Sequence, residues 1–396
     1  MISKKMQSLV AASSTIRAMF EEGKKLSAIY GEENVFDFSI GNPNVEPPEN
    51  IKVAINNILS EENPNLVHGY MNNSGFEDVR DIISSHINKK ENLSLTKENI
   101  VMTCGAAGGL NIILKTLINP EDEVITFAPF FGEYKNYVDN FDGKFTVIPA
   151  DTEKFQINLE LLESSISKST KAIIINSPNN PSGVIYSEDT LKSLASILEK
   201  KQKEFNTSIY LISDEPYREI VYDNVKVPCI LNYYKNSFIG YSYSKSLSLP
   251  GERIGYVVIN SLIDNFSDIV DSLNVANRIL GFVNAPSLFQ KVIAKCIDAE
   301  VDVNVYKKNR DVLYNHLTSI GFSCIKPEGA FYLFPKSPIE DDKEFCNTAK
   351  KFNLLLVPGS AFGCPGYFRI SYCVSYDKIE NSLPAFTKLA KLYKMI

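Results

Sequence analysis

The chain has 396 residues, of which 44% are hydrophobic, and a formal net charge of -6 at pH 7. Because single hydrophobic cores stop growing near about 250 to 300 residues, this length predicts two domains with a substantial buried core. No block of like charges stands out and no stretch approaches the roughly 18 apolar residues of a membrane span, which argues against a nucleic acid or a membrane as partner.

Two elements are predicted in the N-terminal part of the chain. Residues 14–30 carry apolar side chains at helical spacing, and residues 35–40 alternate as a strand does. The strand ends in a turn of composition Gly41-Asn42-Pro43-Asn44. Such a turn needs no ligand by itself.

From Asn99 onward, apolar runs of strand length alternate with helical patterns. Buried strands are predicted over residues 100–103, 123–127, 172–176, 209–213, 238–241 and 257–259. Helices are predicted over residues 110–117, 262–276 and 285–314. This alternation is typical of an α/β fold.

Polar residues follow several of these strands. The Gly- and Ala-rich turn at residues 104–109 opens a helix, so its backbone N–H groups are available to a phosphate. Asp214 follows a buried strand, which is a ligand position in open α/β sheets, although a helix N-cap explains an aspartate there equally well. Residues 177–183 form a turn by composition.

The most informative segment is Ser242 to Tyr256. Lys245 comes just after an apolar run, and a desolvated lysine loses its proton readily, which suits it to Schiff-base formation and general-base catalysis. Ser242, Ser244 and Arg253 offer the hydroxyl donors and the guanidinium fork that a phosphate requires. The alternative is a polar turn whose two cations face water.

Further strands are predicted near the C-terminus, over residues 330–334, 353–357 and 367–372. Arg369 lies inside the last of them, where an arginine is costly unless an anion meets it. A bound anionic ligand and a structural salt bridge both meet that requirement.

The segment from Ser242 to Gly255 resembles the pyridoxal-phosphate (PLP) attachment site of class I/II aminotransferases, which have the aspartate-aminotransferase-like fold type I architecture. Matching segments in the same order extend from Gly41 to Arg369. The resemblance implies an α/β fold with a large doubly wound domain around a mostly parallel sheet, over residues 46–285. A small α/β domain would be formed by residues 1–45 and 286–396.

The resemblance also assigns roles to the matching residues. Lys245 would form the imine with PLP and carry the substrate proton, Asp214 would keep the pyridine nitrogen protonated, and Phe131 would stack on the ring. Asn180 and Tyr217 would hydrogen-bond the phenolic oxygen. The residues implied for the phosphate are Gly105, Ala106, Ala107, Ser242, Ser244, Arg253 and, from a second subunit, Tyr70. The two alanines depart from the hydroxyl or lysine that the family often has, and Phe131 stands where it often has tryptophan.

Four residues are implied in substrate binding. Arg369 would bind the α-carboxylate in a bidentate pair, with Gly41 and Asn180 beside it. Arg278, whose segment loosely resembles the family's dicarboxylate-reading arginine, would come from a second subunit and favour aspartate- or glutamate-like substrates.

The implied activity is transfer of an amino group between an L-amino acid and a 2-oxo acid, in a homodimer. A PLP-dependent C–S β-lyase or a related enzyme of the same fold shares Lys245 and Asp214, so the motifs leave it open. A non-catalytic PLP-binding regulatory domain is the second alternative, although the roughly forty residues before Gly41 are too few for a DNA-reading module.

The seven cysteines are scattered, without a CxxC pair, and the three histidines lack metal-ligand spacing. They predict reduced thiols in a cytoplasmic protein and no metal site.

Overall fold

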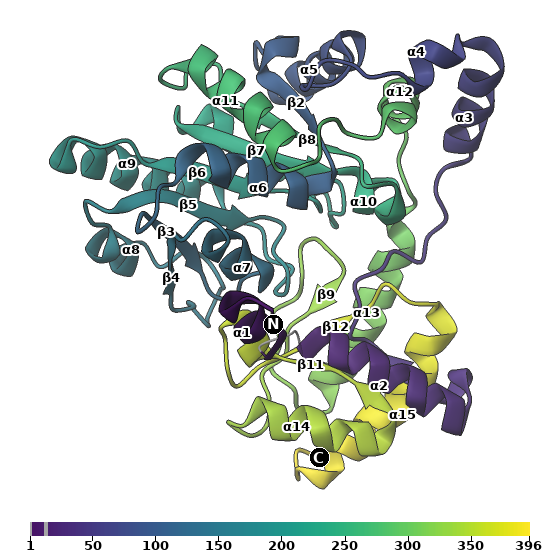
Figure 1. Cartoon of the computed structure of the whole chain (residues 1–396). Helices are drawn as coiled ribbons and strands as arrows, with labels where there is room; N and C mark the ends of the chain where they lie inside the picture. The colour runs from purple at the N-terminus through teal and green to yellow at the C-terminus, as the bar shows by residue number, and fades with distance from the viewer. Residues whose placement is uncertain (1, 12–14) are drawn as a thin grey trace.

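A seven-stranded sheet forms the centre of the larger of two bodies in the computed structural model, which describes residues 2–11 and 15–396 (Figure 1). In spatial order its strands are β2 (Ile100–Thr103), β8 (Gly255–Ile259), β7 (Ser237–Ser242), β6 (Tyr210–Asp214), β5 (Thr170–Asn176), β3 (Glu123–Phe127) and β4 (Lys144–Ile148). Strand β8 is antiparallel to both neighbours, and the other pairs are parallel. The carboxyl ends of β2, β3, β5, β6 and β7 therefore share one edge, where ligands bind in sheets of this kind.

Helices cover both faces of this sheet, because successive residues of each strand point to opposite sides. Val101 and Val257 pack with α6 (Gly105–Leu117) and α11 (Phe266–Ile279). Ile100 and Val258 belong to a second cluster on the opposite face. Its helices are α3 (Glu49–Glu61), α4 (Pro64–His68), α5 (Glu77–Glu91), α8 (Leu159–Ser165), α9 (Glu188–Phe205) and α12 (Ser287–Lys295). This arrangement confirms the predicted α/β fold with a mostly parallel sheet.

The smaller body is built from both ends of the chain. Its sheet has the order β11 (Val357–Pro358), β12 (Phe368–Ser371), β9 (Tyr332–Leu333), all antiparallel, and β1 (Phe36–Asp37) pairs with β10 (Leu354–Leu355). Its helices are α2 (Thr15–Tyr30), α13 (Val303–Ser319), α14 (Asp342–Ala349) and α15 (Tyr376–Leu392). The core between them includes Phe345, Phe386 and Leu389. Three short helices lie elsewhere, namely α1 (Lys4–Ala11), α7 (Glu133–Asp139) and α10 (Tyr243–Ser246).

The domain boundaries after residues 45 and 285 stay a proposal. The element next to the second boundary is α12, whose Val292 and Ile293 are buried among side chains of the larger body. The chain then passes into the smaller body through α13.

Two predicted elements differ from those observed. The helix predicted over residues 285–314 is split into α12 and α13, because the Asp302 side chain accepts a hydrogen bond from the backbone N–H of Asn304 and starts a new helix. The strand predicted over residues 35–40 is only β1, since the Asp37 carboxylate binds the backbone N–H of Ser39 and turns the chain. Residue 14 of the predicted N-terminal helix lies outside the described residues.

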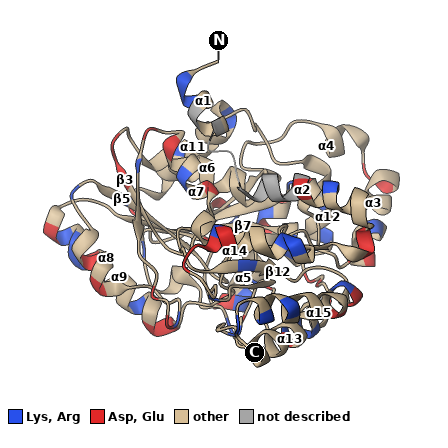
Figure 2. Ribbon diagram, turned by 90° about the horizontal axis from the view of Figure 1, so that it is seen from below, with Lys and Arg blue, Asp and Glu red and all other residues tan. Residues whose placement is uncertain are grey.

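Charged residues of both signs are interspersed along helices such as α9 and α13 (Figure 2). In the part of the chain that the structure describes, no helix combines the length and apolar character needed to cross a membrane. The same residues contain no group of His, Cys, Asp or Glu side chains that could hold a metal ion.

Candidate active site

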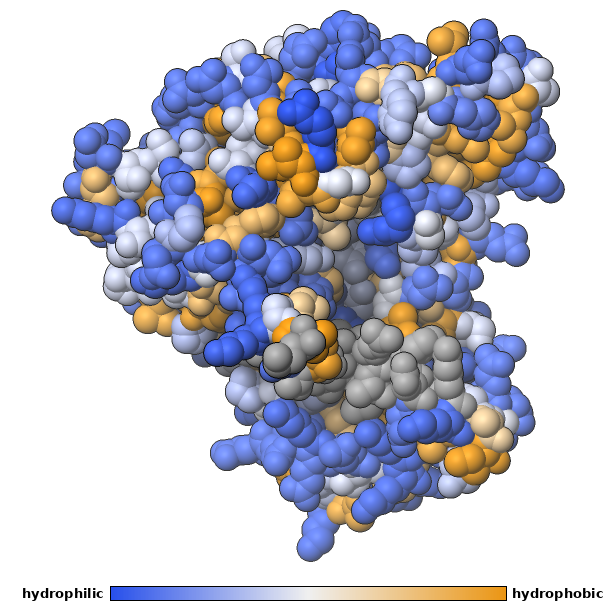
Figure 3. Space-filling view, viewed as in Figure 1, coloured by the Kyte–Doolittle hydropathy of each residue, from blue (hydrophilic) through white to orange (hydrophobic). Residues whose placement is uncertain are grey.

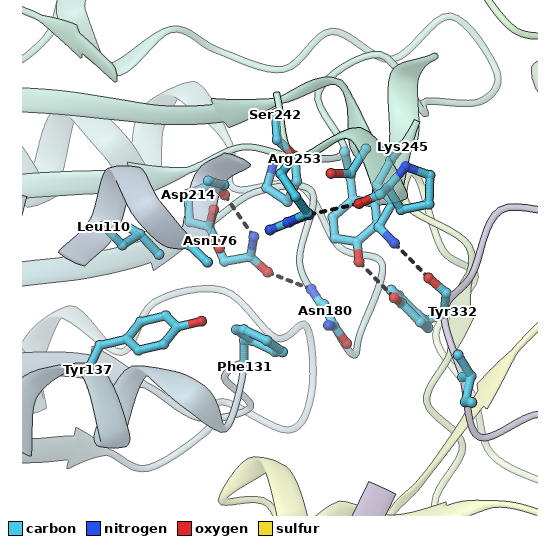
Figure 4. A pocket seen from close by; sticks show the side chains of 18 of the residues that line it. Leu110, Phe131, Tyr137, Asn176, Asn180, Asp214, Ser242, Lys245, Arg253 and Tyr332 are labelled. Atoms are coloured by element: carbon cyan, nitrogen blue, oxygen red, sulfur yellow. Dashed lines mark hydrogen bonds between the residues drawn. The ribbon is translucent and has the colours of Figure 1, made fainter. Parts of the chain in front are cut away.

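A cavity of about 300 Å³ lies where the carboxyl edge of the large sheet faces the smaller body. The larger body contributes Ala106, Ala107, Leu110, Phe131, Tyr137, Asn176, Asn180, Asp214, Pro216, Tyr217, Ser242, Ser244, Lys245, Pro250 and Arg253. From the smaller body and the segment leading out of it come Ile40, Gly41, Tyr332 and Arg369. Figure 4 shows these side chains around a common space.

Lys245 reaches this cavity from α10, directly after β7. Its ammonium donates a hydrogen bond to the carbonyl oxygen of Gly41 at 2.6 Å. Burial lowers the pKa of Lys245 to about 8; the Arg369 and Arg253 charges act in the same direction, and the Cys373 thiol opposes them. About a tenth of this amine is therefore neutral and nucleophilic at pH 7, a much larger fraction than for an exposed lysine.

Asp214 is the last residue of β6 and is fully enclosed. Its Oδ2 accepts a hydrogen bond from the Tyr134 hydroxyl at 2.5 Å, whereas its buried Oδ1 has no partner among the described residues. Burial raises the pKa of Asp214 to about 7; the Tyr134 hydrogen bond lowers it, and the neighbouring Glu215 raises it. A lone carboxylate oxygen beside the cavity suits a cationic N–H donor, because such a donor would relieve the cost of burial.

The other end of the cavity suits a phosphate. Ser242, Ser244 and Arg253 line it, next to the first turn of α6. Gly105 has φ +71°, and a Cβ there would lie 2.8 Å from the Arg253 guanidinium, so a side chain at this position would displace the arginine. Arg253 donates to the Pro250 carbonyl at 2.9 Å, and among the described residues it forms no ion pair. Its charge is therefore available to an anion.

Arg369 is buried in β12 between the rings of Tyr332 and Phe362, which lie 4.7 and 4.8 Å from its guanidinium carbon. It donates to the Asn180 side-chain oxygen at 3.0 Å and to the Ser39 carbonyl at 2.6 Å. Its Nε has no partner, and no carboxylate of the described residues lies within ion-pair distance of it. The structural salt bridge considered from the sequence is therefore not found.

Two residues implied from the sequence do not reach the cavity of their own chain. Tyr70 is 95% exposed, and Arg278 is exposed at the end of α11. Gly105 also does not line the cavity, but it opens the helix whose next two residues do. Phe131 lines it and contacts Tyr134 edge-on, with ring centroids 5.6 Å apart.

Sequence reasoning missed several polar residues of the site, among them Asn176, Tyr134, Tyr137 and Tyr332. Asn176 ends the apolar run of β5, so the rule that selected Asp214 also applied to it; its amide donates to the Asp214 carbonyl at 2.7 Å. Tyr134 and Tyr332 carried no comparable signal, because each sits in an aromatic stretch that is typical of a core. The Tyr332 hydroxyl lies 2.7 Å from that of Tyr217.

Over residues 33–386 the chain matches the family described as aminotransferase class I and II. The chain belongs to this family. The aminotransferase is 34% identical to a probable aspartate aminotransferase of Methanocaldococcus jannaschii, over 88% of this chain and 91% of the relative. A probable aspartate/prephenate aminotransferase of Aquifex aeolicus is 31% identical, over 90% and 91% of the two chains.

A solved amino transferase from Eubacterium rectale is 46% identical, covers 99% of both chains and superposes with a TM-score of 0.97. These matches identify a transaminase of fold type I, and they support neither the lyase nor the regulatory alternative. Enzymes of this type depend on PLP. The cavity fits that cofactor, since it offers an amine, an unpartnered buried carboxylate oxygen and an unpaired arginine.

We expect the cofactor-free aminotransferase to capture PLP faster as the pH rises toward 8. Only the neutral amine attacks an aldehyde, and below a pKa of about 8 its fraction grows about tenfold per pH unit. Stopped-flow absorbance of PLP between pH 6 and pH 10 measures this rate. A rate that levels off above pH 8 agrees with the assignment, whereas one that keeps climbing to pH 10 indicates an ordinary exposed lysine.

Proposed function

We propose that this aminotransferase exchanges amino groups between aspartate- or glutamate-like amino acids and 2-oxo acids, with Lys245 as the residue that bonds PLP. The observation that carries the proposal is Arg369, a buried guanidinium without an acidic partner in the described chain and with a free Nε. An α-carboxylate supplies the missing anion. The printed names of the relatives, aspartate and aspartate/prephenate aminotransferase, support the substrate class.

The chain's own groups divide the work between the two ends of the cavity. When bound, PLP supplies the aldehyde that condenses with the amino group and the ring that takes up electrons from the α-carbon. Asp214 would keep the ring nitrogen protonated through its free Oδ1, and Phe131, which lines the same cavity, would cover the ring. Asn180 and Tyr217 would hydrogen-bond the phenolic oxygen.

Substrate positioning and proton transfer follow from the same geometry. Arg369 and Asn180 hold the carboxylate in the part of the cavity that Gly41 also lines. Lys245 then takes the α-proton from the amino acid as a general base and gives it back as a general acid. A buried amine with a pKa of about 8 suits both steps. The phosphate is held by Ser242, Ser244, Arg253 and the amides of residues 105–107.

A second copy of the chain completes the site in this proposal. Tyr70 projects into solvent, and the two helices that precede it, α3 and α4, expose the apolar side chains of Val53, Leu59 and Leu66. Another apolar patch lies over the C-terminal part of α11 (Figure 3), where Val275 and Ile279 are exposed on the same helix as Arg278. Burial of these surfaces in a homodimer brings Tyr70 to the phosphate and Arg278 to a distal carboxylate of the neighbouring site. The seven free cysteines suit a reducing, cytoplasmic location.

A scan of amino donors against several 2-oxo acids tests the reaction. We expect aspartate or glutamate to be the preferred donor. One molecule of the added 2-oxo acid should be consumed for each molecule of amino donor. Release of pyruvate and ammonia without an added 2-oxo acid would instead indicate lyase chemistry.

The Arg278→Ala variant tests the substrate class. We expect its kcat/KM for aspartate or glutamate to fall about 100-fold and that for alanine to change less than about threefold, because only the dicarboxylates lose a charge-assisted pair. Lys115→Ala, which removes an exposed cation close to Ile279, serves as the control. An unchanged ratio between acidic and neutral donors would rule out this role of Arg278, without affecting the assignment of Lys245.

A further inference from the structure

Tyr332 occupies a position that joins the two halves of the site. It is buried in β9, whose antiparallel pairing with β12 places Tyr332 opposite Ser371 and close to Arg369. Strand β12 carries the arginine that we propose for the carboxylate. The rings of Tyr332 and Phe362 lie 4.7 and 4.8 Å from the Arg369 guanidinium carbon, so both aromatic side chains pack against that group. They limit the orientations that the guanidinium can adopt toward a ligand.

The hydroxyl of Tyr332 faces the cofactor side of the site. It lies 2.7 Å from the hydroxyl of Tyr217, and the two rings meet edge-on with centroids 5.6 Å apart. It also lies against the backbone of Gly41, since a Cβ on Gly41 would be 2.1 Å from it. The carbonyl of Gly41 in turn accepts the hydrogen bond from Lys245. One side chain therefore contacts Tyr217, Arg369 and the segment that faces the lysine.

The direction of the bond between the two hydroxyls follows from the proton count. Each phenol has one proton to donate. If Tyr217 gives its proton to the phenolic oxygen of PLP, as the proposed function requires, then Tyr332 must be the donor in the 2.7 Å pair. Burial raises the pKa of Tyr332 to about 12, so this proton is present throughout the physiological pH range.

We propose that Tyr332 is a positioning residue that donates its hydroxyl proton to Tyr217 and fixes the plane of Arg369 with its ring. The inference rests on the proposed function and deepens it. The hydroxyl acts on the cofactor through Tyr217, and the ring acts on the substrate carboxylate through Arg369. The two contributions of the side chain are therefore separable by mutation.

Tyr332→Phe removes the hydroxyl and keeps the ring. We expect kcat to fall about tenfold, because Tyr217 becomes a weaker donor without a donor of its own, and KM for the amino acid to change less than about twofold. The pH midpoint of the absorbance change of bound PLP should rise by about half a unit, since a weaker donor stabilises the phenolate less. Tyr332→Leu also removes the ring, and we expect KM to rise about five- to tenfold in addition.

Tyr306→Phe is the matched control. Tyr306 is buried against Phe331 in the same core and does not line the cavity. A Tyr332→Phe enzyme with the kcat and the absorbance midpoint of the wild type, or one in which only KM changes, overturns the inference. A wild-type protein that shows no PLP absorbance at all would contradict the proposed function instead, so the two failures are distinguishable.

Discussion

Replacing Lys245 by alanine should lower transamination by at least about 10⁴-fold. The amine acts both as the nucleophile that bonds the cofactor and as the carrier of the α-proton, and positioned general acid–base catalysis alone contributes about 10² to 10⁴-fold. The fold should be retained, because among the residues that the structure describes the ammonium makes one hydrogen bond, to the Gly41 carbonyl, and no ion pair. Initial rates with aspartate and a 2-oxo acid measure the effect.

Lys235→Ala is a suitable control for this variant. Lys235 is a surface lysine ten positions earlier that pairs with Asp264 at 2.8 Å, far from the chemistry. It should leave the rate within about twofold of the wild type. A Lys245→Ala enzyme that retains a tenth or more of the activity, with circular dichroism like that of the wild type, would show that another amine does this work.

Replacing Asp214 by asparagine should cost about 10³-fold in kcat. An ion pair at about 4 Å and an effective dielectric constant near 20 is worth roughly 4 kcal/mol, and the variant loses this preference for the protonated ring. The cofactor-free variant should nevertheless be more stable than the wild type at pH 8. Thermal unfolding without PLP measures that difference, which we expect to be a few degrees.

The sign of the stability effect follows from the pKa. The Asp214 carboxyl has a pKa of about 7 in the folded chain and an ordinary one near 4 when unfolded. Between these values the folded state holds the extra proton, so stability falls as the pH rises through this window and is lowest above pH 7. Asparagine removes this dependence, and the advantage of the variant should shrink between pH 8 and pH 5.

Glu215→Gln separates this effect from a general loss of buried charge. Glu215 is the next residue, also buried, but it pairs with Arg218 at 2.6 Å and does not line the cavity. Its substitution should lower stability and leave PLP binding within about twofold. A cofactor-free Asp214→Asn protein that melts below the wild type at pH 8 would contradict the account of the unpartnered oxygen.

Much of the fold and part of the site are predictable from the chain alone. Strands such as β2 and β3 were predicted residue by residue, because continuous apolar runs bounded by turns leave little choice. Asp214 and Lys245 could be selected because each follows such a strand, and parallel strands end at a common edge. Asn180 was assigned only through the resemblance of its turn to that of the family.

The other residues of the site could not be predicted from the sequence, because their role depends on how the chain folds and how the two bodies meet. In the sequence, Tyr332 is one aromatic residue in an aromatic strand. Only the pairing of β9 with β12 shows that it lines the cavity together with Arg369. Tyr134 is likewise recognised as a residue of the site only from its 2.5 Å hydrogen bond to Asp214, eighty positions away in the sequence. Tyr70 and Arg278 stay predictions, because their partners belong to a second copy of the chain. The split between α12 and α13 was not predicted, because the capping Asp302 starts a new helix within a pattern that is otherwise helical.

The most direct measurement is the location of the borohydride-reduced PLP label. The protein is saturated with PLP, reduced, digested and analysed by mass spectrometry. We expect one labelled site, Lys245, and no label in the Lys245→Ala variant. A label on any other lysine, with Lys245 recovered unmodified, would contradict it.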